Sequence, residues 1–93
     1  MENYEAVGKY VTYKERAKTY AITRNNALKD LVYLVKMSLD AETSNMIAVD
    51  LNFARAKELL EKAADAHNSM VKAVAETNAA ADGCGYPKLM VGK

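Results

Sequence analysis

Apolar residues recur at alternating steps of three and four between Met46 and Ala81, which is the spacing of a heptad repeat. The positions in this stripe are Met46, Val49, Phe53, Ala56, Leu60, Ala63, His67, Met70 and Val74. All are apolar except His67. An amphipathic helix presents such a stripe to one partner surface. The pattern predicts a long helix over about residues 46–81, with Phe53 and Leu60 at the centre of its apolar seam.

A second helical pattern covers about residues 3–39, with one apolar face at 100° per residue. This face contains Tyr10, Tyr13, Ala17, Tyr20, Ala21, Leu28, Leu31, Val35 and Leu39. Its weak section is residues 23–26, where poor helix formers cluster and Arg24 interrupts the apolar face. A kink or break between Arg24 and Asn26 is therefore an alternative, and it would give a three-helix variant.

Residues 40–45 separate the two patterns and favour caps and turns, so we expect an antiparallel helical hairpin. The candidate N-caps of the second helix are Asp40, Thr43, Ser44 and Asp50. At its end, Gly83 suits the left-handed C′ position, and Pro87 follows where a helix cannot continue.

Residues 83–93 are expected to form an irregular tail that nevertheless carries apolar side chains at Tyr86, Leu89, Met90 and Val91. Two placements are open for this tail. It folds back over the open end of its own bundle, or it docks into a partner chain.

Ninety-three residues, 51% apolar and 27% charged, describe one small domain spanning residues 1–93. Ordering a residue costs roughly 1–2 kcal/mol of backbone entropy, and a buried Leu, Val or Met returns roughly 1.5–3 kcal/mol. Two helices in contact along one seam do not close that gap. We therefore expect an all-α hairpin that dimerises into a four-helix bundle. The residues predicted at this oligomer interface are Tyr13, Tyr20, Leu28, Leu31, Phe53, Leu60, His67, Met70 and Val74.

Charge is distributed unevenly along a chain whose net charge is only +1. Residues 9–36 carry seven basic and two acidic residues, whereas residues 37–82 carry four basic and eight acidic ones. This favours a basic helix lying against an acidic one. The longest apolar run, residues 31–35, is far below the roughly 20 residues that span a bilayer, and the N-terminus lacks the features of a secretory signal. We expect no membrane contact and a cytoplasmic location.

The sequence offers little catalytic chemistry. His67 has no second histidine and no Glu three residues before it, so we expect a structural or interface histidine, bonded to a hydroxyl such as that of Tyr13 or Tyr20, rather than a metal ligand. Cys84 and His67 are the one possible thiol–base pair, yet nothing in the pattern fixes their geometry.

Two further features of the chain complete the expectation of a non-enzymatic protein without metal or cofactor. The acidic row of Glu58, Glu61 and Asp65 fits a solvated helix face better than acid–base chemistry. The scattered glycines form no phosphate-binding loop.

Tyrosines and basic residues interleave near the N-terminus, which superficially resembles a platform for single-stranded nucleic acid. Helical spacing instead places Tyr10, Tyr13 and Tyr20 on the apolar face, where they are expected as core or interface aromatics.

A further surface lies outside this apolar face, where five residues fall within about 60° of one another on an ideal helix. They are Lys18, Ile22, Lys29, Tyr33 and Lys36. A second subunit, another protein or nucleic acid are the candidate partners of this outer row. We expect a non-enzymatic protein–protein interaction or regulatory protein that acts as a helical oligomer. The alternative is a nucleic-acid-binding regulator that uses the basic first helix.

Overall fold

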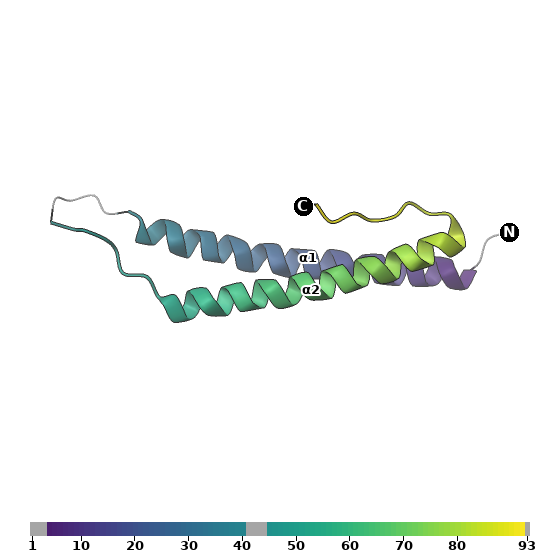
Figure 1. Ribbon diagram of the computed structural model, residues 1–93, viewed down its shortest axis with the longest axis horizontal. Helices are drawn as coiled ribbons and strands as arrows, with labels where there is room; N and C mark the ends of the chain where they lie inside the picture. The colour runs from purple at the N-terminus through teal and green to yellow at the C-terminus, as the bar shows by residue number, and fades with distance from the viewer. Residues whose placement is uncertain (1–3, 41–44, 93) are drawn as a thin grey trace.

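The computed structural model describes residues 4–40 and 45–92. Two long helices, α1 (Tyr4–Ser38) and α2 (Phe53–Cys84), lie against each other as a hairpin (Figure 1). The molecule is a rod with extents of 72 × 19 × 16 Å. No strand occurs within the described ranges. The all-helical hairpin expected from the two apolar stripes is confirmed.

The first helix runs without a break through residues 23–26, so the three-helix alternative is wrong. Its polar interruption is accommodated by α2, because the Arg24 Nε donates a hydrogen bond to the His67 Nδ1 at 3.1 Å. The guanidinium also donates to the Asn25 Oδ1 at 2.6 Å. A polar residue that finds its partner on the facing helix gives the backbone no reason to bend.

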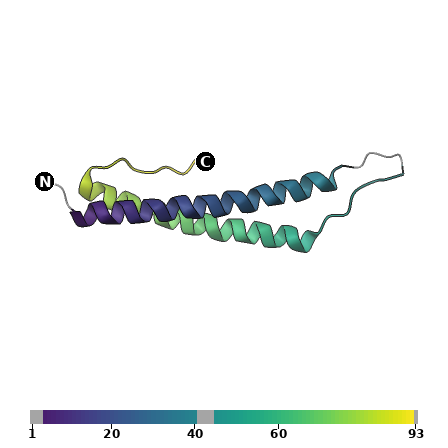
Figure 2. The same ribbon diagram turned by 180° about the vertical axis from the view of Figure 1, so that it is seen from behind.

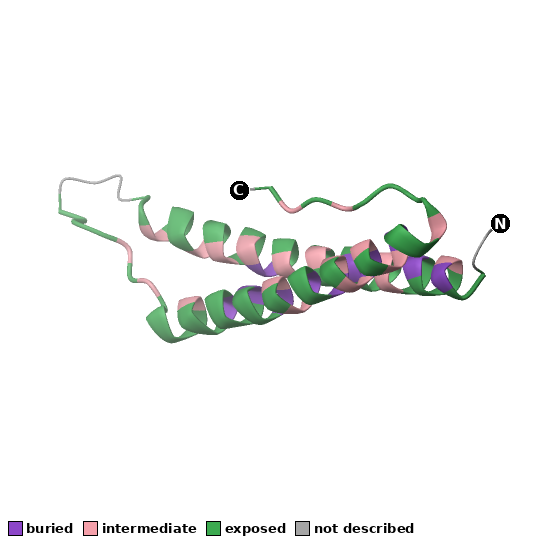
Figure 3. Cartoon of the chain, turned by 45° about the vertical axis from the view of Figure 1, so that its right-hand side comes forward, coloured by how far each residue is buried: buried purple, intermediate pink, exposed green. Residues whose placement is uncertain are grey.

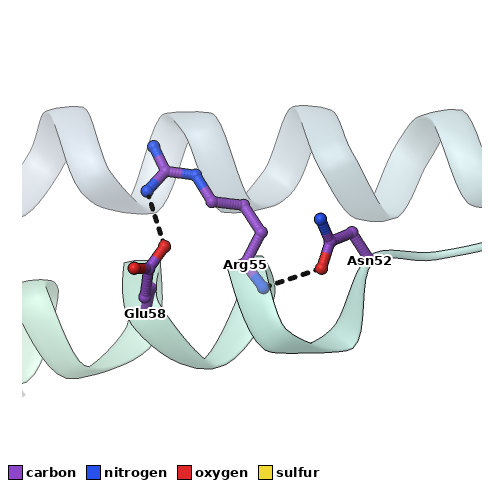
Figure 4. A network of polar contacts seen from close by, with 3 residues as sticks. All are labelled: Asn52, Arg55 and Glu58. Carbon is purple, nitrogen blue, oxygen red and sulfur yellow. Dashed lines mark hydrogen bonds and ion pairs between the residues drawn. The ribbon is translucent and has the colours of Figure 1, made fainter.

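The second helix begins at Phe53, several residues later than the apolar spacing predicts. The cap is Asn52, whose side-chain oxygen accepts a hydrogen bond from the Arg55 backbone N–H at 3.0 Å, while Arg55 pairs with Glu58 at 3.0 Å (Figure 4). An Asn in this position satisfies a backbone donor that the first turn leaves free. Asp40 and Asp50 are therefore not the cap, and the candidates at positions 43 and 44 lie outside the described residues.

The segment before this cap pairs with the end of α1 instead of extending α2. The Ser38 hydroxyl donates to the Val49 carbonyl at 2.8 Å, and the Val49 N–H donates to the Ser38 carbonyl at 3.3 Å. Residues 46–52 are consequently non-helical. The apolar residues of this segment have helical spacing in the sequence, but in the structure the segment joins the two helices.

The end of α2 also differs from the expectation, because Gly83 lies inside the helix and Gly85 takes the C-cap position. Gly85 adopts a left-handed φ of 73°, and its N–H donates to the Ala81 carbonyl at 2.8 Å. Glycine enters this conformation without the steric cost that a side chain brings. The helix therefore continues to Cys84 and turns sharply there.

The seam between the helices is built mainly from alanine. Within the described ranges ten apolar side chains are buried, and seven of them are alanines. The buried positions lie along the two helices (Figure 3). They are Ala6, Tyr10, Ala17, Ala27, Leu59, Ala63, Ala66, Met70, Ala73 and Ala81. Small side chains allow close approach of the two backbones, but each removes little apolar surface from water.

The buried stripe of α2 shares Ala63 and Met70 with the predicted one, and its other positions are shifted from it. It consists of Leu59, Ala63, Ala66, Met70, Ala73, Thr77 and Ala81. Phe53 and Leu60, predicted to be central in the self-association seam, are 68% and 55% exposed in the single chain. The apolar face of α2 is wide enough to contain two neighbouring heptad rows, and close packing against α1 selects the row with the smaller residues.

After Gly85 the chain folds back along its own hairpin, the first of the two predicted placements (Figures 1 and 2). The Asn78 side chain exchanges two hydrogen bonds with the Leu89 backbone, at 3.0 and 2.7 Å. The Tyr10 hydroxyl donates to the Pro87 carbonyl at 2.7 Å, and its ring meets that of Tyr86 edge-on at 5.0 Å. These contacts fix the tail to both helices.

Candidate interaction surfaces

One apolar face extends along the whole hairpin beside the alanine seam. At the tail end it lies under residues 89–92, which together with Ala21, His67, Met70 and Val74 on the helices border a space of about 350 Å³. A residue seven positions further along a packed helix returns to the same side. Leu60 and Phe53 therefore continue the row of His67, and Leu28 and Val35 continue the row of Ala21.

The tail-covered end of this face is held by specific contacts. Val74 and His67 are half-buried there. The hydrogen-bond partner of His67 is Arg24, not the hydroxyl of Tyr13 or Tyr20 that the sequence suggested.

The other end of the face, near the loop, is open. We call it the loop-end face and define it by Leu28, Val32, Val35, Leu39, Phe53 and Leu60. All six are exposed except Leu28, which is half-buried, and no described residue of α1 beyond Ala27 is buried (Figure 3). Aligned large apolar side chains on one surface indicate a binding site more strongly than scattered ones do.

The structure divides the nine residues predicted at an oligomer interface. Leu28, Phe53 and Leu60 belong to the loop-end face, Leu31 lies next to it beside Val35, and His67 and Val74 are under the tail. Met70 is buried in the chain's own seam.

Tyr13 and Tyr20 lie on the opposite side of the hairpin, where they border a polar hollow with Ser69 and Lys72. Val32 is the residue that the sequence reading missed. Its helical spacing placed it on this face, since it lies four residues after Leu28 and seven before Leu39.

The outer row of Lys18, Ile22, Lys29, Tyr33 and Lys36 is exposed along its whole length. Within it, the Lys18 ammonium lies 3.8 Å from the Glu15 carboxylate. This row is therefore a second accessible surface, with two large apolar groups among three cations.

Two of the interleaved tyrosines near the N-terminus contact basic residues of their own helix. Tyr10 is buried, with the Lys14 ammonium 5.5 Å from its ring centre. The Arg16 guanidinium lies 5.3 Å from the ring centre of Tyr13. A ring that is already covered by its own chain has no free face for a base.

The residues weighed for catalysis are not brought together. Cys84 and His67 both belong to α2 and are separated by about 25 Å along its axis at 1.5 Å per residue, so they do not form a nucleophile–base pair. Glu58 is engaged by Arg55.

In the ranges 4–40 and 45–92, no three His, Cys, Asp or Glu side chains are grouped to hold a metal ion. Neither α1 nor α2, over the residues described, combines the length and apolarity of a membrane-spanning helix.

The surface area is large for the chain's mass. The molecule exposes 7114 Å², whereas a compact monomer of 10.2 kDa exposes about 5,300 Å² by the general relation between surface and mass. The elongated shape and the open loop-end face account for this difference. Compared with protein-family models, curated proteins and solved structures, the chain matches none of them.

Proposed function

We propose that this protein is a non-enzymatic helical interaction protein that works as a homodimer, in which two hairpins form a four-helix bundle through their loop-end faces. One contrast carries the proposal. The seam inside the hairpin is made mainly of alanines, while larger side chains such as Phe53, Leu60 and Val32 lie outside it on one exposed face.

The energetics favour a partner on this face. Fully burying a side chain of the size of Val, Leu or Phe stabilises by roughly 1.5–3 kcal/mol, and a buried alanine contributes much less. The excess surface over a compact monomer is about 1,800 Å², and a standard protein–protein interface buries about 800 Å² on each partner. A second hairpin with the same apolar face supplies matching chemistry, and two-fold dimers are the commonest soluble assemblies.

The outer row gives the dimer its regulatory or adaptor role. Lys18, Lys29 and Lys36 frame Ile22 and Tyr33 along the exposed side of α1, and Lys29 and Lys36 also border the loop-end face. Two apolar anchors within a cationic frame suit a partner protein with an apolar contact surrounded by acidic residues.

Sedimentation velocity on three chains tests self-association. The parent is expected to be a dimer at micromolar concentration, and Phe53→Glu with Leu60→Glu should weaken association at least about 100-fold, because charges would enter a dry interface. Val11→Glu is the matched control, since it places one charge on an exposed apolar position of α1 outside the face. A parent that sediments as a stable monomer contradicts the proposal.

The nucleic-acid alternative has its own signature. If Lys14, Lys18, Lys29 and Lys36 followed a phosphate backbone, affinity for DNA or RNA would fall steeply with salt, and Lys18→Glu with Lys29→Glu would abolish it. For a protein partner, Tyr33→Ala is the damaging change and salt acts weakly. Salt-sensitive nucleic-acid binding at physiological ionic strength would overturn the proposal of a protein partner.

A further inference from the structure

We infer that the two hairpins of the dimer lie antiparallel, loop half against loop half, and that the C-terminal tail of each chain is the stop that sets this register. This inference rests on the proposed homodimer. It adds the geometry of the assembly and gives the tail, residues 86–92, a role in it.

The tail occupies the same face that continues into the loop-end face. Residues 89–92 lie over Ala21, Arg24, His67 and Val74. The covered part therefore ends near the level of Arg24 and His67, and the open part begins with Leu28 and Leu60. The chain itself therefore covers one part of this surface, and the Arg24–His67 pair lies where the covered part meets the open part.

Two face-to-face arrangements satisfy two-fold symmetry. In the parallel one, both loops lie at the same end, so the two tails face each other between the hairpins. In the antiparallel one, the loop halves overlap and each tail lies beyond the overlap. Facing helices in a bundle approach to about 8–10 Å. That distance leaves no room for two layers of tail, so the parallel arrangement would force the loop halves apart.

The tail resists displacement from this position. It is fastened by the paired hydrogen bonds of Asn78 to Leu89, by Tyr10 to Pro87, and by the Lys88 ammonium on the Asp82 carboxylate at 3.0 Å. Because it is anchored to both helices, the tail is a fixed boundary that a second copy does not easily displace from the face.

Repulsion between like charges at the rim of the interface slightly disfavours this packing. Antiparallel copies bring α1 against α1, so Lys29 and Lys36 approach the same residues of the second copy. Exposed like charges repel one another only weakly, because solvent screens them. On α2 the same symmetry brings Lys57 toward Glu61 of the other copy, which offsets part of that cost.

The single cysteine makes the register measurable on the natural chain. Cys84 lies about 40 Å along α2 from Lys57, which is near the centre of the open half, so spin labels on the two copies are about 80 Å apart in the antiparallel dimer and within about 25 Å in the parallel one. Pulsed electron–electron double resonance distinguishes these distances. A second sample, Cys84→Ser with Lys57→Cys, places the labels beside the two-fold axis, and we expect them within about 20 Å.

Three results are possible. Long Cys84 distances with short Lys57→Cys distances support the inference. A dimer whose Cys84 labels lie closer than about 50 Å, judged by the same helical rise, overturns the inference and leaves the proposed homodimer standing. A monomer in sedimentation overturns the proposed homodimer itself.

The stop is tested separately with a chain that ends after Gly85. Without the tail, the covered half of the face becomes available, so short Cys84 distances are expected to appear beside the long ones. A truncated dimer that keeps only the long distance contradicts the role of the tail, since something else would then set the register.

Discussion

The two ends of the hairpin treat the same apolar face in opposite ways. At the tail end, Val74 and His67 lie under residues 89–92, which are hydrogen-bonded to Asn78. At the loop end, Leu60 and Phe53 continue the same heptad row and remain exposed. The comparison shows that two long helices packed through an alanine seam leave the apolar side chains beside the seam exposed unless another segment covers them. The chain's own tail supplies that cover for one half.

The largest effect on stability is expected from a substitution in the seam between the two helices. Ala73→Leu inserts a branched side chain at a buried position of the tail end, and we expect a loss of roughly 1–3 kcal/mol in unfolding free energy because the backbones must separate. Urea unfolding measures it. Ala75→Leu, at an exposed position two residues away, should stay within about 0.5 kcal/mol. Equal effects of the two changes would show that the observed phase of α2 is incorrect.

Releasing the tail gives the next effect. Asn78→Ala removes both hydrogen bonds to the Leu89 backbone, and we expect a loss of about 1–2 kcal/mol at the tail end. Hydrogen exchange at the Leu89 amide, which donates one of these bonds, should accelerate strongly. The matched change, Asn68→Ala on an exposed turn of α2, should leave this amide protected. Unaltered exchange in the Asn78 variant would mean that the tail is held elsewhere.

The loop end has its own local anchor. Asn52→Ala removes the N-cap of α2 and is expected to cost about 1 kcal/mol, with fraying confined to the first turn around Phe53. Asn26→Ala, on the exposed side of α1, should instead gain a few tenths of a kcal/mol through helix propensity. Chemical-shift measurement of helicity at residues 53–56 checks this, and an unchanged first turn would argue that α2 starts without the cap.

The smallest effect is expected at the junction of helix and tail. Cys84→Ser should change stability by less than about 0.5 kcal/mol, because the thiol is half-buried and makes no disulfide. The dimer should also be insensitive to reductant. Loss of association in this variant would point to a disulfide between chains.

The sequence contained the fold but not the phase of its packing. Alternating steps of three and four were sufficient for two helices and a hairpin. They did not distinguish Leu59, Ala66 and Ala73 from Leu60, His67 and Val74, because both rows are largely apolar and differ mainly in size. Size decides the choice only when a second helix is present to pack against.

The single polar residues in the two apolar stripes, taken together, indicate which levels of the two helices face each other. Arg24 and His67 each interrupt an apolar face, and in an antiparallel hairpin they fall at the same level, where they form a hydrogen bond. The start of α2 was misjudged for a different reason. The apolar spacing at Met46 and Val49 continues that of α2, but Asn52 fixes the first turn and leaves those residues outside the helix.

Thermal unfolding at different protein concentrations tests the central claim most directly, because it asks whether the open loop-end face is covered by a second copy. For a dimer, a hundredfold rise in concentration adds about 2.7 kcal/mol of apparent stability and should raise the Tm by about 5–10 °C in circular dichroism. We expect this rise in the parent and its absence in the chain with Phe53→Glu and Leu60→Glu. A cooperative transition in the parent whose Tm is independent of concentration would contradict self-association.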